Sequence, residues 1–185
     1  RELNEEELEF IRRSFDIIGD IAIIEVPKEV SHLKHKIGDA ILQVHKNIRT
    51  VLAKVGKVDS EFRLRKLEHI AGEKKTETIH REHGCVFVLD VSKVYFSPRL
   101  GTEHWRVASQ VKEGEIVVDM FTGIGPFAIL IAKRVDTTVY AIDKNPYAIK
   151  YLEENIKRNK LRGKVIPILG DAKQIIKEKM FGKAD

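Results

Sequence analysis

The stretch that most constrains the fold is residues 119–126, which read Asp-Met-Phe-Thr-Gly-Ile-Gly-Pro. An apolar, β-branched run precedes it at residues 115–119, and an apolar run of helical length follows at residues 127–134. A strand-like run, a turn with two glycines and a helical pattern predict one strand–loop–helix unit. We expect Gly123 and Gly125 to let the backbone approach a ligand where a Cβ atom would collide.

The elements around this turn predict a nucleoside site on a parallel sheet. The helix aims free N–H groups and a partial positive charge at the turn, and Pro126 fits its first helical position. A second strand, at residues 137–143, ends in Asp143, whose carboxylate can accept both hydroxyls of a ribose. A third strand ends in Asp171, which with Ala172 stands where an adenine amino group can be read. Asp171 can instead be the N-cap of a helix over residues 172–178.

The features that the turn lacks indicate which nucleoside it binds. A dinucleotide fingerprint requires a third glycine, but this chain has Ile129 or its neighbours in that place. The negative charge of Asp119 would also repel a pyrophosphate, whereas a carboxylate attracts the positively charged sulfonium and ammonium groups of S-adenosylmethionine. We therefore expect a methyltransferase-type site. A nicotinamide or flavin site and a purely structural turn remain the alternatives.

Composition and charge restrict the setting of the protein. The 185 residues contain one cysteine, Cys85, which excludes an intramolecular disulfide and favours a reducing compartment. No apolar run approaches transmembrane length and there is no signal peptide, so we expect a cytoplasmic protein without a membrane partner. Residues 34–66 contain nine Lys or Arg against three acidic residues, whereas residues 1–16 contain three basic and six acidic residues. The basic stretch fits either a polyanionic partner or a solvated charged surface.

The part of the chain before the cofactor unit reads as mixed α+β. We predict helices at residues 5–13 and 30–46, strands at 14–26 about a Gly19-Asp20 turn, at 50–54 and at 66–72, a basic loop at 57–65, paired strands at 76–80 and 85–91, and a linking helix at 103–111. A further helix at 146–159 has Asn145 as its cap. Three strands and three helices make about half of a doubly wound sheet, and the chain begins with Arg1, so we expect it to be a fragment.

Over nearly the whole chain, these motifs resemble the archaeal tRNA (guanine(37)-N(1))-methyltransferases. The cofactor motif, which many class I methyltransferases share, is Asp119-x-Phe-x-Gly-x-Gly-Pro-Phe with Tyr140-Ala-Ile-Asp-x-Asn-Pro-x-Ala. The family-specific segment is Lys93-Val-Tyr-Phe-Ser-Pro-Arg-Leu-Gly-x-Glu. The segments Phe62-Arg-x-Arg-x-Leu-Glu-His-x-Ala-Gly-Glu and Thr78-Ile-His-x-Glu-x-Gly match the family as well.

The resemblance implies an α/β fold class and a reaction. Residues 1–98 would form a small α+β tRNA-recognition domain, and residues 99–185 the N-terminal half of a Rossmann-like methyltransferase domain. The reaction would move a methyl group from S-adenosylmethionine to N1 of the guanosine just 3′ of the anticodon. The partner would be the anticodon stem-loop of tRNA, bound by a monomer. The family's small tRNA-elbow domain and its Asn-Leu-Pro or Asn-Pro-Pro segment are not found in the 185 residues.

The resemblance also assigns roles to individual residues. Guanine N1 carries a proton that a base must remove, and the charge developing on O6 needs a donor. Glu103 would be the base, and Arg99 the donor near O6 or the phosphate. Arg63 would contact the target nucleotide and Tyr95 would stand beside the site, while Phe121 belongs to the cofactor motif. Without the resemblance, we would interpret Glu103 and Arg99 as a surface ion pair. Arg63 would be interpreted as a surface arginine, and Tyr95 as a core residue.

Two other functions fit much of the same sequence. A wyosine-pathway aminocarboxypropyl transferase uses the same cofactor and fold, although the Pro-Arg-Leu-Gly-x-Glu segment argues against it. A catalytically inert tRNA-binding fragment is the other alternative, and the intact set of cofactor residues argues against it. We expect no metal site, because the spacing of His69, His80 and His83 resembles no zinc motif.

Overall fold

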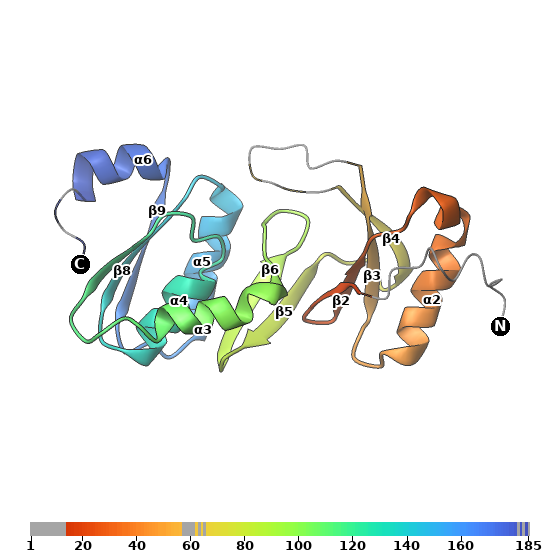
Figure 1. Cartoon of the computed structure of the whole chain (residues 1–185), viewed down its shortest axis with the longest axis horizontal. Helices are drawn as coiled ribbons and strands as arrows, with labels where there is room; N and C mark the ends of the chain where they lie inside the picture. Colours follow the sequence, from red (N-terminus) through yellow and green to blue (C-terminus); the bar gives the residue numbers. More distant parts are fainter. Residues whose placement is uncertain are drawn as a thin grey trace.

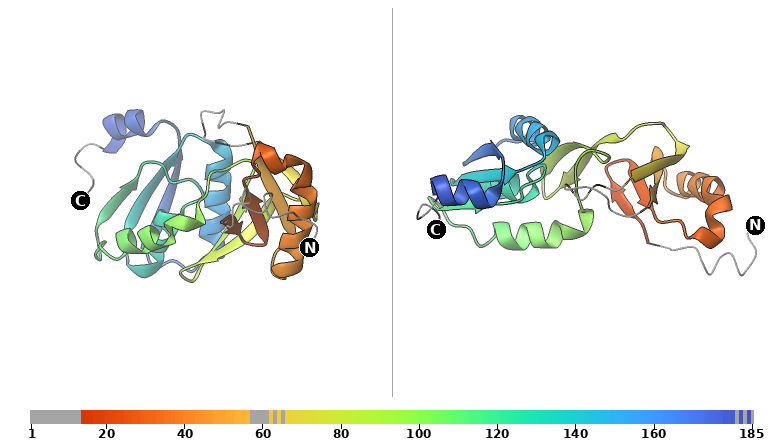
Figure 2. Two further views of the ribbon diagram at one scale, coloured as in Figure 1. Left: turned by 45° about the vertical axis from the view of Figure 1, so that its right-hand side comes forward. Right: turned by 90° about the horizontal axis from the view of Figure 1, so that it is seen from above.

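A computed structural model describes residues 14–56, 62, 64, 66–180, 182 and 184. The helix expected at residues 5–13, most of the expected loop at 57–65 and the candidate residue Arg63 lie outside these residues. Figures 1 and 2 show an elongated arrangement, with a first sheet and its helix at one end, a parallel sheet at the other and a hairpin between them. No helix in the described part of the chain is long and apolar enough to cross a membrane.

The first sheet has four strands in chain order, namely β1 (Asp16–Ile18), β2 (Ile21–Ile24), β3 (Thr50–Val55) and β4 (Lys66–Gly72). Strands β2 and β3 are parallel, because the 3-10 helix η1 (Lys28–Leu33) and helix α2 (Lys34–Val44) cross over between them. The helix predicted at residues 30–46 therefore becomes regular only at Lys34, since Val30 has non-helical dihedrals. Its partly buried Ile37, Ile41 and Leu42 pack on the sheet.

The hairpin consists of β5 (Glu77–Glu82) and β6 (Cys85–Asp90), paired antiparallel as predicted. Its two turn residues, His83 and Gly84, both have positive φ, at 47° and 73°. Two-residue turns with positive φ at both positions match the right-handed twist of the strands, which explains the sharp reversal here.

The second sheet is parallel and contains β7 (Ile116–Asp119), β8 (Thr138–Asp143) and β9 (Lys164–Leu169) in that order. Helix α4 (Pro126–Arg134) connects the first two strands and α5 (Pro146–Arg158) the next two, with proline at the first helical position of each. This unit confirms the predicted strand–loop–helix pattern. The last helix differs from prediction, because α6 (Ala172–Ile175) passes into a π-helical turn at Ile176–Met180.

The segment between the hairpin and β7 also differs from prediction. The apolar run at residues 94–96 leads into the 3-10 helix η2 (Pro98–Leu100) and helix α3 (Gly101–Ala108). Helix α3 thus begins two residues earlier and ends three residues earlier than the helix predicted at 103–111. Glu103 therefore stands in its first turn.

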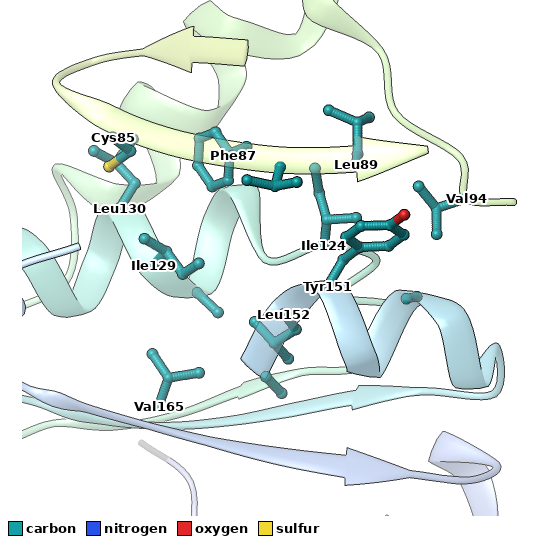
Figure 3. Close-up of a cluster of buried hydrophobic side chains, with 14 of the residues drawn as sticks. Cys85, Phe87, Leu89, Val94, Ile124, Ile129, Leu130, Tyr151, Leu152 and Val165 are labelled. Carbon is teal, nitrogen blue, oxygen red and sulfur yellow. The ribbon is translucent and has the colours of Figure 1, made fainter. Parts of the chain in front are cut away.

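The main core lies between the hairpin and the parallel sheet. Figure 3 shows β6 lying over α4 and α5, with the parallel strands beneath the helices. Phe87 and Leu89 project from β6, and Ile129, Leu130 and Leu152 from the two helices, all at most 2% exposed. Burying five such side chains contributes roughly 1.5–3 kcal/mol each, so the hairpin is bound to this layer by the hydrophobic effect.

Two asparagines of α5 hold the hairpin by hydrogen bonds. The side chain of Asn155 accepts from the Val88 N–H at 2.7 Å and donates to the Val88 and Ile124 carbonyls, both at 3.2 Å. Asn159 pairs in the same way with the N–H and carbonyl of Val86, at 3.0 and 2.8 Å. The two amides act as partners for the free edge of β6, and Asn155 also ties this edge to the glycine turn. The domain boundary that we place after residue 98 stays a prediction. The packing of the hairpin on α4 and α5 favours a boundary before the hairpin.

We predict that Asn155→Leu destabilises the fold strongly. The substitution keeps the volume but leaves the Val88 N–H, the Val88 carbonyl and the Ile124 carbonyl without their partner, at a cost of about 1–3 kcal/mol per buried group. Urea unfolding followed by circular dichroism measures the change. Gln110→Leu, at an exposed position, is the control and should change the unfolding free energy by less than about 0.5 kcal/mol. Equal stability of the two variants would contradict the role of Asn155.

Candidate active site

The carboxyl ends of the parallel strands bring the predicted acidic residues to one edge of the sheet. Asp119 is the last residue of β7 and pairs in register with Ala141 of β8, two residues before Asp143. Asp143 pairs with Leu169 at the end of β9, and Asp171 follows two residues later. The structure therefore brings together the carboxylates that the sequence placed at three separate strand ends, at the edge where open α/β sheets bind ligands.

Asp119 is the most unusual of these carboxylates. Its Oδ2 atom and the nearby Thr122 hydroxyl are buried and have no hydrogen-bond partner among the described residues. Burial raises the pKa of Asp119 to about 6, and the negative charge of Asp143 adds to that rise, while the nearby Thr122 hydroxyl and the backbone N–H of Phe121 offset part of it. A buried carboxylate with an unpaired oxygen is costly, so its presence at this edge points to a cationic ligand.

The glycine turn is tied to the next strand through Asp143. One carboxylate oxygen of Asp143 accepts from the Gly123 N–H at 2.8 Å, and the other accepts from the Asn145 N–H at 2.9 Å. Gly123 has a φ of 55°, and the nearest atom to a Cβ placed there would be the Tyr95 carbonyl oxygen, at 3.6 Å. The turn surface at Gly123 is therefore open, as expected for a backbone that a ligand approaches.

Gly125 has a packing role, and its expected approach to a ligand stays a prediction. Its φ is 92°, and a Cβ there would lie 2.4 Å from Leu152 Cδ1 and 3.1 Å from Ile129 Cδ1. The collision is with the core and α5, not with a ligand position. Gly125 is thus required by the left-handed backbone at the start of α4 and by packing beneath the turn.

Asp171 is the N-cap of α6, as the alternative interpretation of this residue predicted. One oxygen accepts from the Gln174 N–H at 3.1 Å, and the other lies 2.8 Å from Lys144 Nζ. The Lys144 ammonium and the Gln174 N–H hold the pKa of Asp171 below its ordinary value. Ala172, next to it, is buried. On the side of β7, Phe121 is 80% exposed and lies at the rim of the same edge.

The segment that carries Tyr95 lies against this edge. Asn145, the cap of α5, donates through Nδ2 to the Lys93 carbonyl at 2.8 Å and accepts from the Tyr147 N–H at 3.0 Å. Tyr95 is 58% exposed, so it is not the core residue of the alternative interpretation. It lines a cavity of about 370 Å³ that extends to the first sheet.

Arg99 crosses this cavity to the first sheet. Its Nε lies 2.6 Å from Asp16 Oδ1 on β1, and Lys54 Nζ lies 3.4 Å from Asp16 Oδ2. The sequence offered no signal for this partner, because Asp16 is 83 residues away in the chain. Arg99 is thus held at the mouth of the cavity by a carboxylate of the first sheet.

Glu103 is paired with Arg106 and not with Arg99. The guanidinium of Arg106 donates from Nε to Glu103 Oε2 at 2.7 Å and from Nη2 to Oε1 at 2.5 Å. Arg106 holds the pKa of Glu103 below its ordinary value. Sequence reasoning missed Arg106, although its spacing of three residues on a helix is the signal of such a pair. Among the described residues, no group of three or more His, Cys, Asp or Glu side chains could hold a metal ion.

We predict that Asp119→Asn raises the stability of the protein above pH 6. Because the pKa of Asp119 lies near 6 in the folded state and near 3.8 in the unfolded chain, its charge destabilises the fold increasingly as pH rises between these values. The variant should gain up to about 3 kcal/mol at pH 8, with no gain below pH 4. Asp143→Asn is the matched control and should lose stability, since an amide nitrogen cannot accept a backbone N–H. Urea unfolding at pH 4, 6 and 8 measures both, and a less stable Asp119→Asn at pH 8 would refute the assignment.

Comparison with known proteins identifies the family. Residues 78–184 match the model of the TRM5/TYW2 methyltransferase domain, and residues 1–76 match that of the TYW2 N-terminal domain. The tRNA (guanine(37)-N(1))-methyltransferase Trm5b of Pyrococcus abyssi is 58% identical over 166 residues, which are 90% of this chain and 50% of that protein. Its crystal structure matches with a TM-score of 0.86 and 56% identity, covering 94% of this chain and 52% of the other.

Two further structures that this chain resembles are complexes with a ligand. A complex of aTrm5 with tRNALeu matches with a TM-score of 0.83 and 39% identity, over 96% of this chain and 58% of the other. Methanocaldococcus jannaschii TYW2 in complex with AdoMet matches with a TM-score of 0.59 and 38% identity, over 85% of this chain and 57% of the other. The chain spans about half the length of the curated relatives it matches. By the match of residues 78–184, it belongs to the TRM5/TYW2 methyltransferase family.

Proposed function

We propose that the protein is a tRNA (guanine(37)-N(1))-methyltransferase that uses S-adenosylmethionine. The observation that carries the proposal is the buried, unpaired carboxylate oxygen of Asp119 beside the open glycine turn, in a chain 58% identical to a relative of that name. The expected cytoplasmic location and monomeric state remain predictions that belong with this proposal.

The residues at the sheet edge fit a nucleoside with a cationic sulfur. Asp119 has a free, desolvated oxygen that favours a positive charge, and Gly123 leaves its backbone accessible. Asp143 would hold the ribose after giving up one of its two backbone N–H donors, and Asp171 with Ala172 would read the adenine. Phe121 and Pro126 would line the same pocket. S-adenosylmethionine, when bound, supplies a methyl group that is already activated by the sulfonium.

The chain's own residues must then handle the proton on guanine N1. Glu103 is the proposed base and accepts this proton on a carboxylate oxygen, which requires Arg106 to turn away from it. Arg99 is the proposed donor to the charge that develops on O6, and it reaches the cavity mouth from its contact with Asp16. Tyr95 and Arg63 would hold the target nucleoside. The anticodon stem-loop would lie across the cavity, which Lys54 and Arg99 line.

A second candidate is an aminocarboxypropyl transferase of the wyosine pathway. It is favoured by the match of residues 1–76 to the TYW2 N-terminal domain. It is also compatible with the match of residues 78–184, because that methyltransferase domain is common to TRM5 and TYW2. The higher similarity to Trm5b structures supports the methyltransferase instead. Mass spectrometry of tRNA after incubation with the full-length gene product separates the two, because the added groups differ in mass. No added mass would favour an inert tRNA-binding protein.

We predict that Glu103→Gln in the full-length gene product lowers kcat for methyl transfer by about 100-fold or more while S-adenosylmethionine affinity stays nearly unchanged. The amide has the shape of the carboxylate but cannot take up the N1 proton. Single-turnover assays measure kcat, and calorimetry measures the affinity. Glu154→Gln, which breaks a similar exposed pair with Arg158 on α5, is the control. Wild-type rates for Glu103→Gln across neutral pH would exclude Glu103 as the base.

The Arg106 pair gives a separate prediction about pH. Since Arg106 lowers the pKa of Glu103, Arg106→Gln should return that pKa towards 4.5 and move the acidic limb of the pH–rate profile to higher pH. Profiles of kcat/KM against pH from 4 to 8 for wild type and variant measure the displacement, because they report the free enzyme, in which Arg106 pairs with Glu103. Arg158→Gln, which frees Glu154, should leave the profile in place. A displacement of the acidic limb to lower pH would contradict the role of Glu103 as the base.

A further inference from the structure

A nearly buried carboxylate lies directly beneath the start of α3, outside the residues assigned so far. Glu82, the last residue of β5, has a side chain that is 10% exposed. Its Oε1 lies 2.6 Å from His104 Nδ1, and its Oε2 lies 3.9 Å from His80 Nε2. A Cβ on Gly101 would come within 3.0 Å of the same Oε2 atom, so the carboxylate packs closely against the first turn of α3.

His104 connects this carboxylate to the cofactor unit. It is 1% exposed, and its ring packs edge-on against Phe127 of α4, with centroids 4.6 Å apart and planes at 85°. Phe127 is the second residue of α4 and follows the glycine turn directly. His104 also directly follows Glu103, the proposed base. The imidazole therefore links the helix that carries Glu103 to the helix that begins at the glycine turn.

His80 extends the contacts in the other direction, towards the first sheet. Its Nδ1 accepts from the Gly19 N–H at 3.2 Å, in the turn between β1 and β2. The ring of Phe96 lies between the two histidines, with centroids 5.0 Å from His80 and 6.4 Å from His104. One chain of contacts thus runs from the first sheet through the hairpin to α3 and α4.

The charge on Glu82 is maintained by these imidazoles. Burial alone would raise the pKa of Glu82, but the hydrogen bond with His104 and then the contact with His80 lower it to about 2. Glu82 therefore stays ionised at every pH at which the protein would work. A nearly buried ionised acceptor binds an imidazole N–H more strongly than a neutral acceptor would, and it fixes the ring orientation.

We propose that Glu82 and His104 are positioning residues that fix the start of α3, and with it Glu103, relative to the glycine turn. The inference rests on the proposed function, because it matters for rate only if Glu103 acts on the substrate. Catalytic groups need orientation to within a fraction of an ångström, and the Glu103 side chain itself makes an exposed pair with Arg106. The chain of contacts also makes the position of Glu103 depend on the first sheet.

Kinetics of the full-length gene product test the positioning role. Glu82→Gln keeps the volume and an acceptor but removes the charge, and we expect kcat for methyl transfer to fall about 10- to 100-fold with KM for S-adenosylmethionine changed less than about twofold. The matched control is Glu77→Gln in the same strand, whose carboxylate accepts from the Tyr151 hydroxyl at 2.7 Å, away from α3. It should leave kcat within about twofold of wild type. A Glu82→Gln variant with wild-type kcat, or equal losses in both variants, would overturn the proposal.

A pair of His104 variants separates positioning from mere stability. Asparagine places an amide near the position of Nδ1 and keeps a donor for Glu82, whereas glutamine places its amide near Nε2 and loses that donor. Both variants lose the ring packed against Phe127, so their melting temperatures should fall alike. We expect His104→Asn to retain at least about fivefold more kcat than His104→Gln. Equal rates for the two would show that only packing matters and would refute the proposal.

Fluorescence tests the anchoring of α3 without any assay of activity. Trp105 is the single tryptophan of the chain, lies on α3 next to His104, and is half-exposed beneath the Arg134 guanidinium, 4.8 Å from its ring. If Glu82 fixes this helix, Glu82→Gln should increase acrylamide quenching of Trp105 about twofold, and Glu77→Gln should leave it unchanged. Unchanged quenching in Glu82→Gln would overturn the proposal. A wild-type protein that transfers no methyl group, with quenching increased in Glu82→Gln, would refute the proposed function and leave the anchoring supported.

Discussion

The structure depends on one electrostatic constraint, which is a buried carboxylate with one oxygen left without a partner at the carboxyl edge of a parallel sheet. The register of β7 with β8 pairs Asp119 with Ala141, two residues before Asp143, and the Oδ2 atom of Asp119 is buried. Such an arrangement weakens the folded state at neutral pH, because the charge is desolvated and one of its oxygens has no hydrogen-bond partner. Destabilising buried charges of this kind are found where binding or catalysis requires them. The buried carboxylate therefore indicates a cation-binding site at this edge of the sheet.

The rest of the methyltransferase part of the chain supports this edge from beneath. Leu152 of α5 fills the space under Gly125, and Asn155 of the same helix holds the Ile124 carbonyl in the middle of the turn. The hairpin covers both helices and contributes the hydrophobic surface that offsets the cost of the buried charge. The first sheet joins the same assembly through Asp16, which binds Arg99 across the cavity.

The sequence predicted the features that are local in the chain. Pro126 and Asn145 start their helices as expected, and the strand ends bring Asp119 and Asp143 together, because turn chemistry and β-branched runs act over a few residues. It could not predict what Gly125 packs against or that Asn155 pairs with Val88, since these contacts join segments far apart in the sequence. The assignment of acidic residues to a cofactor therefore came from spacing, whereas their partners could only be seen in three dimensions.

The most direct test of the cationic site is calorimetry of the full-length gene product with S-adenosylmethionine and, separately, with NAD. We predict that S-adenosylmethionine binds and NAD does not. We also predict weaker S-adenosylmethionine binding at pH 5 than at pH 8, because Asp119, whose pKa is raised to about 6 by burial, is then largely protonated. Binding of NAD without S-adenosylmethionine, or equal S-adenosylmethionine affinity at the two pH values, would contradict the account.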